Sequence, residues 1–68
     1  MNVTVIRTAM IKDELIQVIT TGSGADVFLQ RYEVHGKHMS RLVLIESRHF
    51  RDERPAVSEF NAYCVLQH

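Results

Sequence analysis

The sequence predicts a small α+β domain, in which helices pack on one face of a single-layer, three-stranded antiparallel sheet in the order β-α-β-β-α. Three observations predict this class: a β-branched run near the N-terminus, a helical spacing of apolar residues over 8–21, and an alternating hairpin over 26–50. An extra C-terminal strand is one alternative, and an all-β meander is the alternative fold. With 68 residues, the chain is expected to form a single compact domain, 1–68.

The first two elements are expected to be a strand and a helix. Asn2–Arg7 is rich in β-branched residues, which favours a strand. From residue 8 onward the apolar side chains fall on one side of a helical wheel, which predicts a helix over 8–21 that ends at Gly22. A β-hairpin turning at Lys12-Asp13 is the competing interpretation. We prefer the helix because alternation is not clean over 15–19.

A β-hairpin is expected to follow the flexible connection Gly22-Ser23-Gly24. Asp26–Val34 alternates between polar and apolar residues, and Met39–Phe50 forms the second arm. Gly36 can adopt the positive φ that tight hairpins require, so Gly36-Lys37 is expected to form a two-residue turn. This turn predicts the cross-strand pairs Tyr32–Arg41, Leu29–Leu44 and Phe28–Ile45.

The second arm contains four consecutive apolar residues, Leu42–Ile45, within an otherwise alternating stretch. Because successive side chains of a strand point to opposite faces, this run makes both faces of the sheet apolar. A chain of this length has little material with which to cover two faces. Two interpretations stay open: a partner covers the second face, or the segment after Pro55 packs on it.

The C-terminal segment fits two structures. Pro55 interrupts the sheet, and Asp52 is a suitable N-cap for a helix with Pro55 in its first turn. Val57, Phe60 and Cys64 then share one helical face. Ala62–Leu66 fits a strand equally well, so the pattern leaves both alternatives open.

Composition indicates the cellular setting. The formal net charge is zero, so no strong overall attraction to nucleic acid or to a membrane surface is expected. Cys64 is the only cysteine, which excludes an internal disulfide and favours a reducing compartment. No apolar stretch approaches the ~20 residues of a membrane span, and Met1–Val5 does not resemble a secretory signal. We therefore expect a cytoplasmic protein.

The residues show no signature of a metal, a cofactor or catalysis. His35 and His38 flank the predicted turn, but His49 lies a full strand away, and the spacing matches no zinc pattern. Cys64 has apolar neighbours that suit a small buried side chain. Glu46 and His49, three residues apart on a strand, point to opposite faces. We expect no catalytic residue, no cofactor and no metal.

The function that these features favour is that of a small non-enzymatic protein-binding module. Such a module acts stoichiometrically, as an inhibitor, adaptor or regulator of a larger protein, in the manner of phage or mobile-element accessory proteins. Aromatic, arginine and leucine anchors are expected to form its partner-binding surface. The predicted anchors are Tyr32, Arg41, Leu42, Leu44, Arg48 and Phe50. The alternatives are a nucleic-acid-binding protein that uses the arginine-rich segment 41–54, and a homodimer with no other partner.

Overall fold

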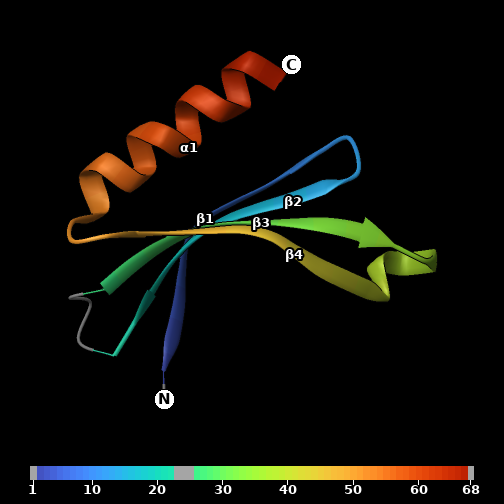
Figure 1. The fold of residues 1–68 in the computed structure, drawn as a ribbon, viewed down its shortest axis with the longest axis horizontal. Coiled ribbons are helices and arrows are strands. Elements are labelled where there is room, and N and C mark those ends of the chain that lie inside the picture. Colours follow the sequence, from blue (N-terminus) through green and yellow to red (C-terminus); the bar gives the residue numbers. More distant parts are fainter. Residues whose placement is uncertain (1, 23–25, 68) are drawn as a thin grey trace.

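Four antiparallel strands and one C-terminal helix make up the computed structural model, which describes residues 2–22 and 26–67. The elements are β1 (Val3–Ile11), β2 (Glu14–Thr21), β3 (Asp26–His35), a 3₁₀ turn (Lys37–Met39), β4 (Arg41–Phe50) and α1 (Glu53–Gln67). The strand order is β1-β2-β3-β4, so each strand pairs with its neighbour in the chain (Figure 1). The predicted α+β class is confirmed at this level.

Helix α1 lies across one face of the sheet, and no other described element covers the opposite face (Figure 1). The core therefore forms between α1 and the side chains that the strands direct toward it. Ile16, Val18 and Val27 from the two central strands are almost completely buried there. Ala56 and Phe60 are the buried side chains of α1. Burial of these residues supplies the main driving force for folding.

The predicted helix over 8–21, the predicted order β-α-β-β-α and the three-stranded sheet are wrong. This segment forms the hairpin of β1 and β2, with Ile11 paired to Glu14 around Lys12-Asp13. Lys12 adopts a φ of 55°, which the tight turn requires. Five of the eight residues of β2 are β-branched, and these pack better on a pleated sheet than in a helix. The meander considered as the alternative describes the sheet.

The predicted two-residue turn at Gly36-Lys37 is also wrong. The chain passes through the 3₁₀ turn at Lys37–Met39, and His38 and Met39 both take a positive φ. The longer turn shifts the register, and Ile45 forms a bulge opposite β3. The observed pairs, which replace Tyr32–Arg41, Leu29–Leu44 and Phe28–Ile45, are Tyr32–Leu44, Leu29–Arg48 and Phe28–His49. As a result, Leu42 and Leu44 lie on the same face as Phe28 and Tyr32.

The C-terminal segment is helical, so the helix is confirmed and the extra strand is wrong. Helix α1 begins directly after Asp52, with Pro55 in its first turn. The predicted apolar face is present in large part: Phe60 is buried, while Val57 and Cys64 are partly buried against the core. The strands predicted at 2–7, 26–34 and 39–50 correspond to β1, β3 and β4. Two residues of the predicted connection, Ser23 and Gly24, lie outside the described residues.

Candidate protein-binding surface

The sheet face opposite α1, called the open face below, is organised in rows that run across the strands. The register of the three strand pairs places one residue of every strand in each row. The first row, called the apolar row, consists of Met10, Leu15, Tyr32 and Leu44. The second row is polar and consists of Thr8, Gln17, Gln30 and Ser47. The third row consists of Val5, Ile19, Phe28 and His49.

Exposure on the open face is greatest at the two edge strands. Met10 and Leu44, at the two ends of the apolar row, are 47% and 51% exposed. Val5, at the β1 end of the third row, is also exposed, whereas Leu15 on a central strand is sheltered by its neighbours. Transferring a side chain of this size from water to an apolar contact contributes about 1.5–3 kcal/mol. The exposed apolar side chains of the open face would therefore contribute binding free energy if a partner buried them.

Hydrogen bonds hold the polar side chains of the second row, and the aromatic side chains beside it, in defined positions. The amide nitrogen of Gln30 donates to Ser47 Oγ at 3.3 Å, and the hydroxyl of Tyr32 donates to Gln30 Oε1 at 2.8 Å. The ring of His49 lies 5.1 Å from that of Phe28, centroid to centroid, and its Nε2 is 2.8 Å from Asp26 Oδ1. These contacts fix two aromatic rings on the face before any partner binds.

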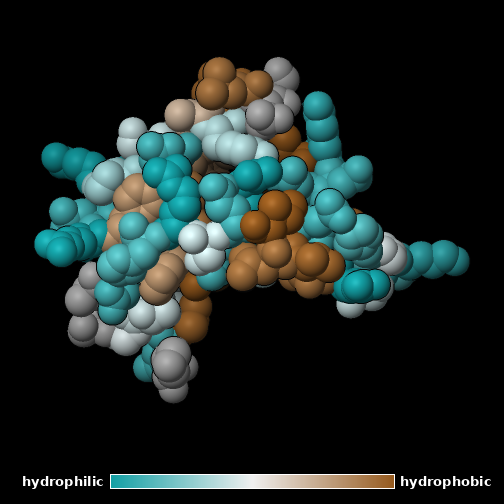
Figure 2. All heavy atoms as spheres, in the orientation of Figure 1, coloured by the Kyte–Doolittle hydropathy of each residue, from teal (hydrophilic) through white to brown (hydrophobic). Residues whose placement is uncertain are grey.

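The apolar run Leu42–Ile45 lies on β4, at the edge of the sheet. Its four side chains are between 38% and 51% exposed. Figure 2 shows hydrophobic atoms gathered over the middle of β4. The segment after Pro55 does pack on one apolar face of the sheet, because helix α1 covers Val27 and Leu29. Leu42 and Leu44 lie on the opposite face, so the expectation that this segment also covers them is wrong.

The structure divides the six predicted anchors between the two faces of the sheet. Tyr32, Leu42 and Leu44 come together on the open face, where Tyr32 and Leu44 are direct cross-strand partners. Arg41, Arg48 and Phe50 lie on the face that carries α1. Arg41 does so because it alternates with Leu42 and Leu44, and Arg48 and Phe50 do so because the bulge at Ile45 reverses the alternation. Tyr32, Leu42 and Leu44 therefore belong to one surface on the open face. The other three predicted anchors are not part of that surface.

The other three predicted anchors have contacts of their own. Arg48 Nη1 lies 3.5 Å from Glu59 Oε2 on α1, and its guanidinium stacks 5.3 Å from the centre of the Phe50 ring. Phe50 is half-buried and packs against the core. Arg41 is exposed near the start of β4, across from His35. The sheet thus separates Arg41 and Arg48, which belong to the arginine-rich segment 41–54, from the ring of Tyr32.

Sequence reasoning missed the part of the open face that β1 and β2 contribute. Met10 and Leu15 complete the apolar row, and Val5 and Ile19 complete the third row. The hairpin interpretation of 8–21 would have found them, because a turn at Lys12-Asp13 places Met10 directly opposite Leu15. The density of β-branched residues in β2 was the signal available for that choice.

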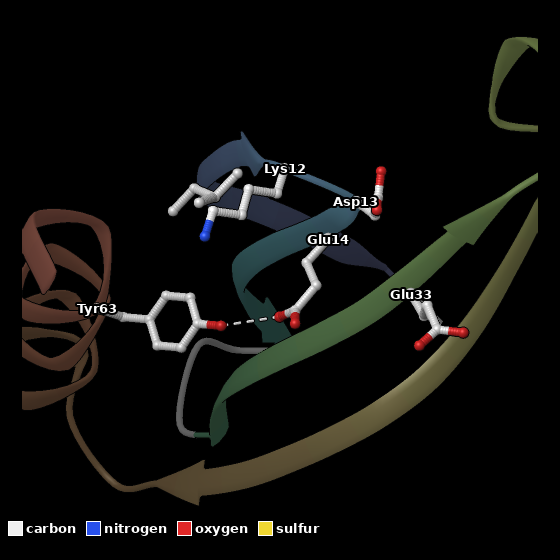
Figure 3. A pocket seen from close by; sticks show the side chains of 6 residues that line it. Lys12, Asp13, Glu14, Glu33 and Tyr63 are labelled. Atoms are coloured by element: carbon white, nitrogen blue, oxygen red, sulfur yellow. Dashed lines mark hydrogen bonds between the residues drawn. The ribbon is translucent and has the colours of Figure 1, made fainter. Parts of the chain in front are cut away.

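A second cluster of polar side chains lies on the other face, beneath the C-terminal half of α1. The guanidinium of Arg31 donates to both oxygens of Glu14, at 3.0 and 3.3 Å, and to Glu46 Oε1 at 3.0 Å. The Tyr63 hydroxyl donates to Glu14 Oε1 at 2.8 Å, and the ring lies 4.9 Å from the Arg31 guanidinium carbon. Figure 3 shows Tyr63 reaching from α1 to the Glu14 carboxylate.

The polar groups of this cluster pair with each other, and the pairing shifts the pKa values of Glu14 and Tyr63. Hydrogen bonds from Arg31 lower the pKa of Glu14, against the opposing effect of burial, and the Tyr63 hydroxyl lowers it further. Burial and the hydrogen bond to Glu14 raise the pKa of Tyr63. Glu14 therefore stays ionised and Tyr63 stays neutral near pH 7, which suits a structural link between α1 and the sheet rather than proton transfer.

A cavity of about 240 Å³ adjoins this cluster, at the β1–β2 turn. It is lined by Ile11, Lys12, Asp13, Glu14, Glu33 and Tyr63 (Figure 3). Pockets that enclose small-molecule ligands are usually ~300–1,000 Å³. Across residues 2–22 and 26–67, no three His, Cys, Asp or Glu side chains converge in a way that suits a metal ion.

Two findings complete the description of the surface. The helix in the described part of the chain is too short and too polar to cross a membrane. Comparisons with protein-family models, with curated proteins and with solved structures find no match to this chain. The surface geometry is therefore the basis for assigning a function.

Proposed function

We propose that the protein is a non-enzymatic binding module that docks on a larger protein through its open face. The observation that supports this proposal is the apolar row Met10, Leu15, Tyr32 and Leu44, which crosses all four strands of a sheet face that α1 leaves uncovered. Met10 and Leu44 at the ends of this row are exposed, and exposed apolar side chains on an uncovered face are typical of protein–protein interaction sites.

The energetic scale supports an interaction surface. The side chains of Met10, Leu42 and Leu44 are about half exposed, so burying what remains contributes about half of the ~1.5–3 kcal/mol of a fully exposed side chain. The sum of about 2–4 kcal/mol is comparable to the ~3–5 kcal/mol that the core of so small a domain supplies. The fixed polar row beside them gives a partner a defined set of donors and acceptors to match. Apolar anchors combined with oriented polar groups favour specific binding of one partner over non-specific association.

Stoichiometric action is the mode that suits this site. The open face offers apolar contact and hydrogen bonds, and the charged cluster on the other face is internally paired. A domain with these features acts by occupying a surface of its partner, as an inhibitor, adaptor or regulator does. Such a domain regulates its partner if the surface that it covers on the larger protein is one that the larger protein needs for its own function.

Affinity capture with variants of the apolar row tests this proposal. Met10→Asp and Leu44→Asp place a charge at opposite ends of the row, on strands that do not touch each other. Val65→Asp is the matched control, because Val65 is 74% exposed and lies on α1, away from the open face. We expect one protein to be recovered at fixed stoichiometry by the wild type and by Val65→Asp, and to be lost with both variants of the row.

Two outcomes would overturn the proposal. One is recovery of the same partner by all three variants, once circular dichroism has shown that each is folded. The other is tight binding of DNA or RNA that weakens steeply with added salt, which would favour a nucleic-acid-binding protein instead.

A further inference from the structure

We propose that a second copy of this chain pairs with the outer edge of β4, so that the two β4 strands run antiparallel about a two-fold axis at Val43. Strand β4 is the last strand of the sheet, and among the described residues it pairs only with β3. One set of its backbone N–H and C=O groups therefore faces outward, and exposed edge groups of this kind are ready to pair with another strand. The inference goes beyond the proposed function and does not depend on it.

The charges around the apolar run fit a second copy. Arg41 precedes Leu42–Ile45 and Glu46 follows it. Antiparallel pairing about Val43 places Arg41 of each copy opposite Ile45 of the other, one residue from Glu46. The bulge at Ile45 puts the Glu46 side chain on the same face as Arg41, so the two charges lie diagonally across the seam at both of its ends. Arg41 is exposed and makes no ion pair within the described residues. The Glu46 side chain is 42% exposed although it accepts a hydrogen bond from Arg31, so it retains room for a second cation.

The alternation of side chains selects the register. An axis at Val43 places Leu42 opposite Leu44 of the partner, and both side chains belong to the open face. It also places the two Val43 side chains together on the face that carries α1. An axis at Leu44 would instead place Leu42 opposite Glu46, which the bulge at Ile45 has moved to the α1 face. Since directly opposed residues share a face, the axis at Val43 matches like faces and the axis at Leu44 does not.

The opposite edge of the sheet is less suited to pairing. Strand β1 has a bulge at Ile6, and the Ile6 carbonyl accepts a hydrogen bond from Arg7 Nη1 at 2.9 Å. Bulges and charged side chains are the features by which edge strands resist association. The bulge of β4 lies at Ile45, outside the central Leu42–Leu44 segment that pairs about the two-fold axis. Helix α1 follows the Phe50 end of β4 and leaves the Arg41 end uncovered (Figure 1).

A cysteine at the axis tests the pairing directly. In a Cys64→Ser background, Val43→Cys places two thiols at facing positions of adjacent antiparallel strands, where the ~4.5–5.5 Å between Cα atoms suits a disulfide. Val65→Cys in the same background is the control, because Val65 is far more exposed than Val43 and random collisions favour it. We expect mild oxidation to cross-link Val43→Cys at least roughly tenfold faster, since pairing raises the effective thiol concentration. Equal or slower cross-linking of Val43→Cys would overturn the pairing.

Sedimentation over a concentration series provides a second measurement that needs no cysteine. We expect the wild type to dimerise reversibly and Arg41→Glu to raise the dimer dissociation constant roughly tenfold, because the charge at both ends of the seam becomes repulsive. Arg51→Glu, outside β4, is the matched control and is expected to leave the constant unchanged. A wild type that stays monomeric throughout would overturn the inference. Met10→Asp is expected to leave the dimer intact, which separates this test from that of the proposed function.

Discussion

The hydroxyl of Tyr63 on α1 donates a hydrogen bond to the Glu14 carboxylate at the start of β2, at 2.8 Å and across 49 residues of sequence. This bond joins the only helix of the described chain to the sheet by a polar contact, beyond the apolar core between them. Arg31 holds the same carboxylate from the next strand. The position of α1, and with it the choice of which face stays open, therefore depends on this link as well as on Phe60.

Replacing Tyr63 by Phe is expected to lower the free energy of unfolding by about 1–2 kcal/mol, because the bond removed is made to a charged group. Tyr32→Phe is the matched control: it also removes one 2.8 Å hydrogen bond, but within β3, and is expected to cost about 0.5 kcal/mol or less. Urea denaturation measures both changes. Equal losses in the two variants would contradict a special role for the Tyr63 bond.

Loss of stability in acid is expected to depend on Glu14. Arg31 lowers the pKa of this carboxyl in the folded state, so its ionised form stabilises the fold above the ordinary value of 4.5. That contribution disappears as the pH falls below 4.5 and passes through the lowered folded-state pKa. Glu14→Gln is expected to cost about 1.5–3 kcal/mol at pH 7 and progressively less as the pH falls below 4.5.

Denaturation of both proteins between pH 7 and pH 2 checks this expectation. Glu59→Gln is the control, because Glu59 makes only an exposed 3.5 Å pair with Arg48, and such pairs contribute at most about 1 kcal/mol. If the difference between wild type and Glu14→Gln did not change with pH, the stabilisation would not arise from the charge.

Replacing Thr20 by Val is expected to stabilise the protein by about 1 kcal/mol. The Thr20 hydroxyl oxygen is buried and has no hydrogen-bond partner within the described residues, and an unsatisfied buried polar group costs roughly this much. Thermal denaturation measures the gain. Thr8→Val, at an exposed position of β1, is expected to change stability by less than about 0.5 kcal/mol. A destabilised Thr20→Val would show that the hydroxyl has a partner after all.

Replacing Gly36 by Ala is expected to destabilise the β3–β4 turn by about 1–3 kcal/mol. Gly36 has φ 79° and ψ 174°, a region that is essentially restricted to glycine, and an added methyl group would meet Ser40 Oγ. Gly22→Ala is the comparison, because Gly22 has φ 57° and open space around it, so about 1 kcal/mol is expected. Hydrogen exchange in β4 provides a local measurement, and protection that matched the wild type would contradict the expectation.

Local sequence patterns were sufficient to predict those elements for which residue propensity, periodicity and capping residues all indicate the same structure. The β-branched N-terminal run, the alternation of 26–34 and the Asp52 and Pro55 signals all describe structures that form. The segment 8–21 was ambiguous because Ile11, Leu15, Val18 and Ile19 fit one side of a helix and also fit two faces of a hairpin. Only the pairing of β2 with β1 and β3 separates these alternatives, since burial of Ile16 and Val18 needs strands on both sides.

The sequence by itself determined that Leu42–Ile45 would make both faces of one strand apolar, because a strand alternates its side chains whatever its neighbours are. Only the tertiary structure decided which face α1 covers and which residues share a face across strands. Both outcomes depend on register, and the bulge at Ile45 moves every later side chain of β4 to the opposite face relative to strict alternation. Tyr32 thus lies beside Leu44 and away from Arg48, because cross-strand neighbours are set by the length of the turn between them.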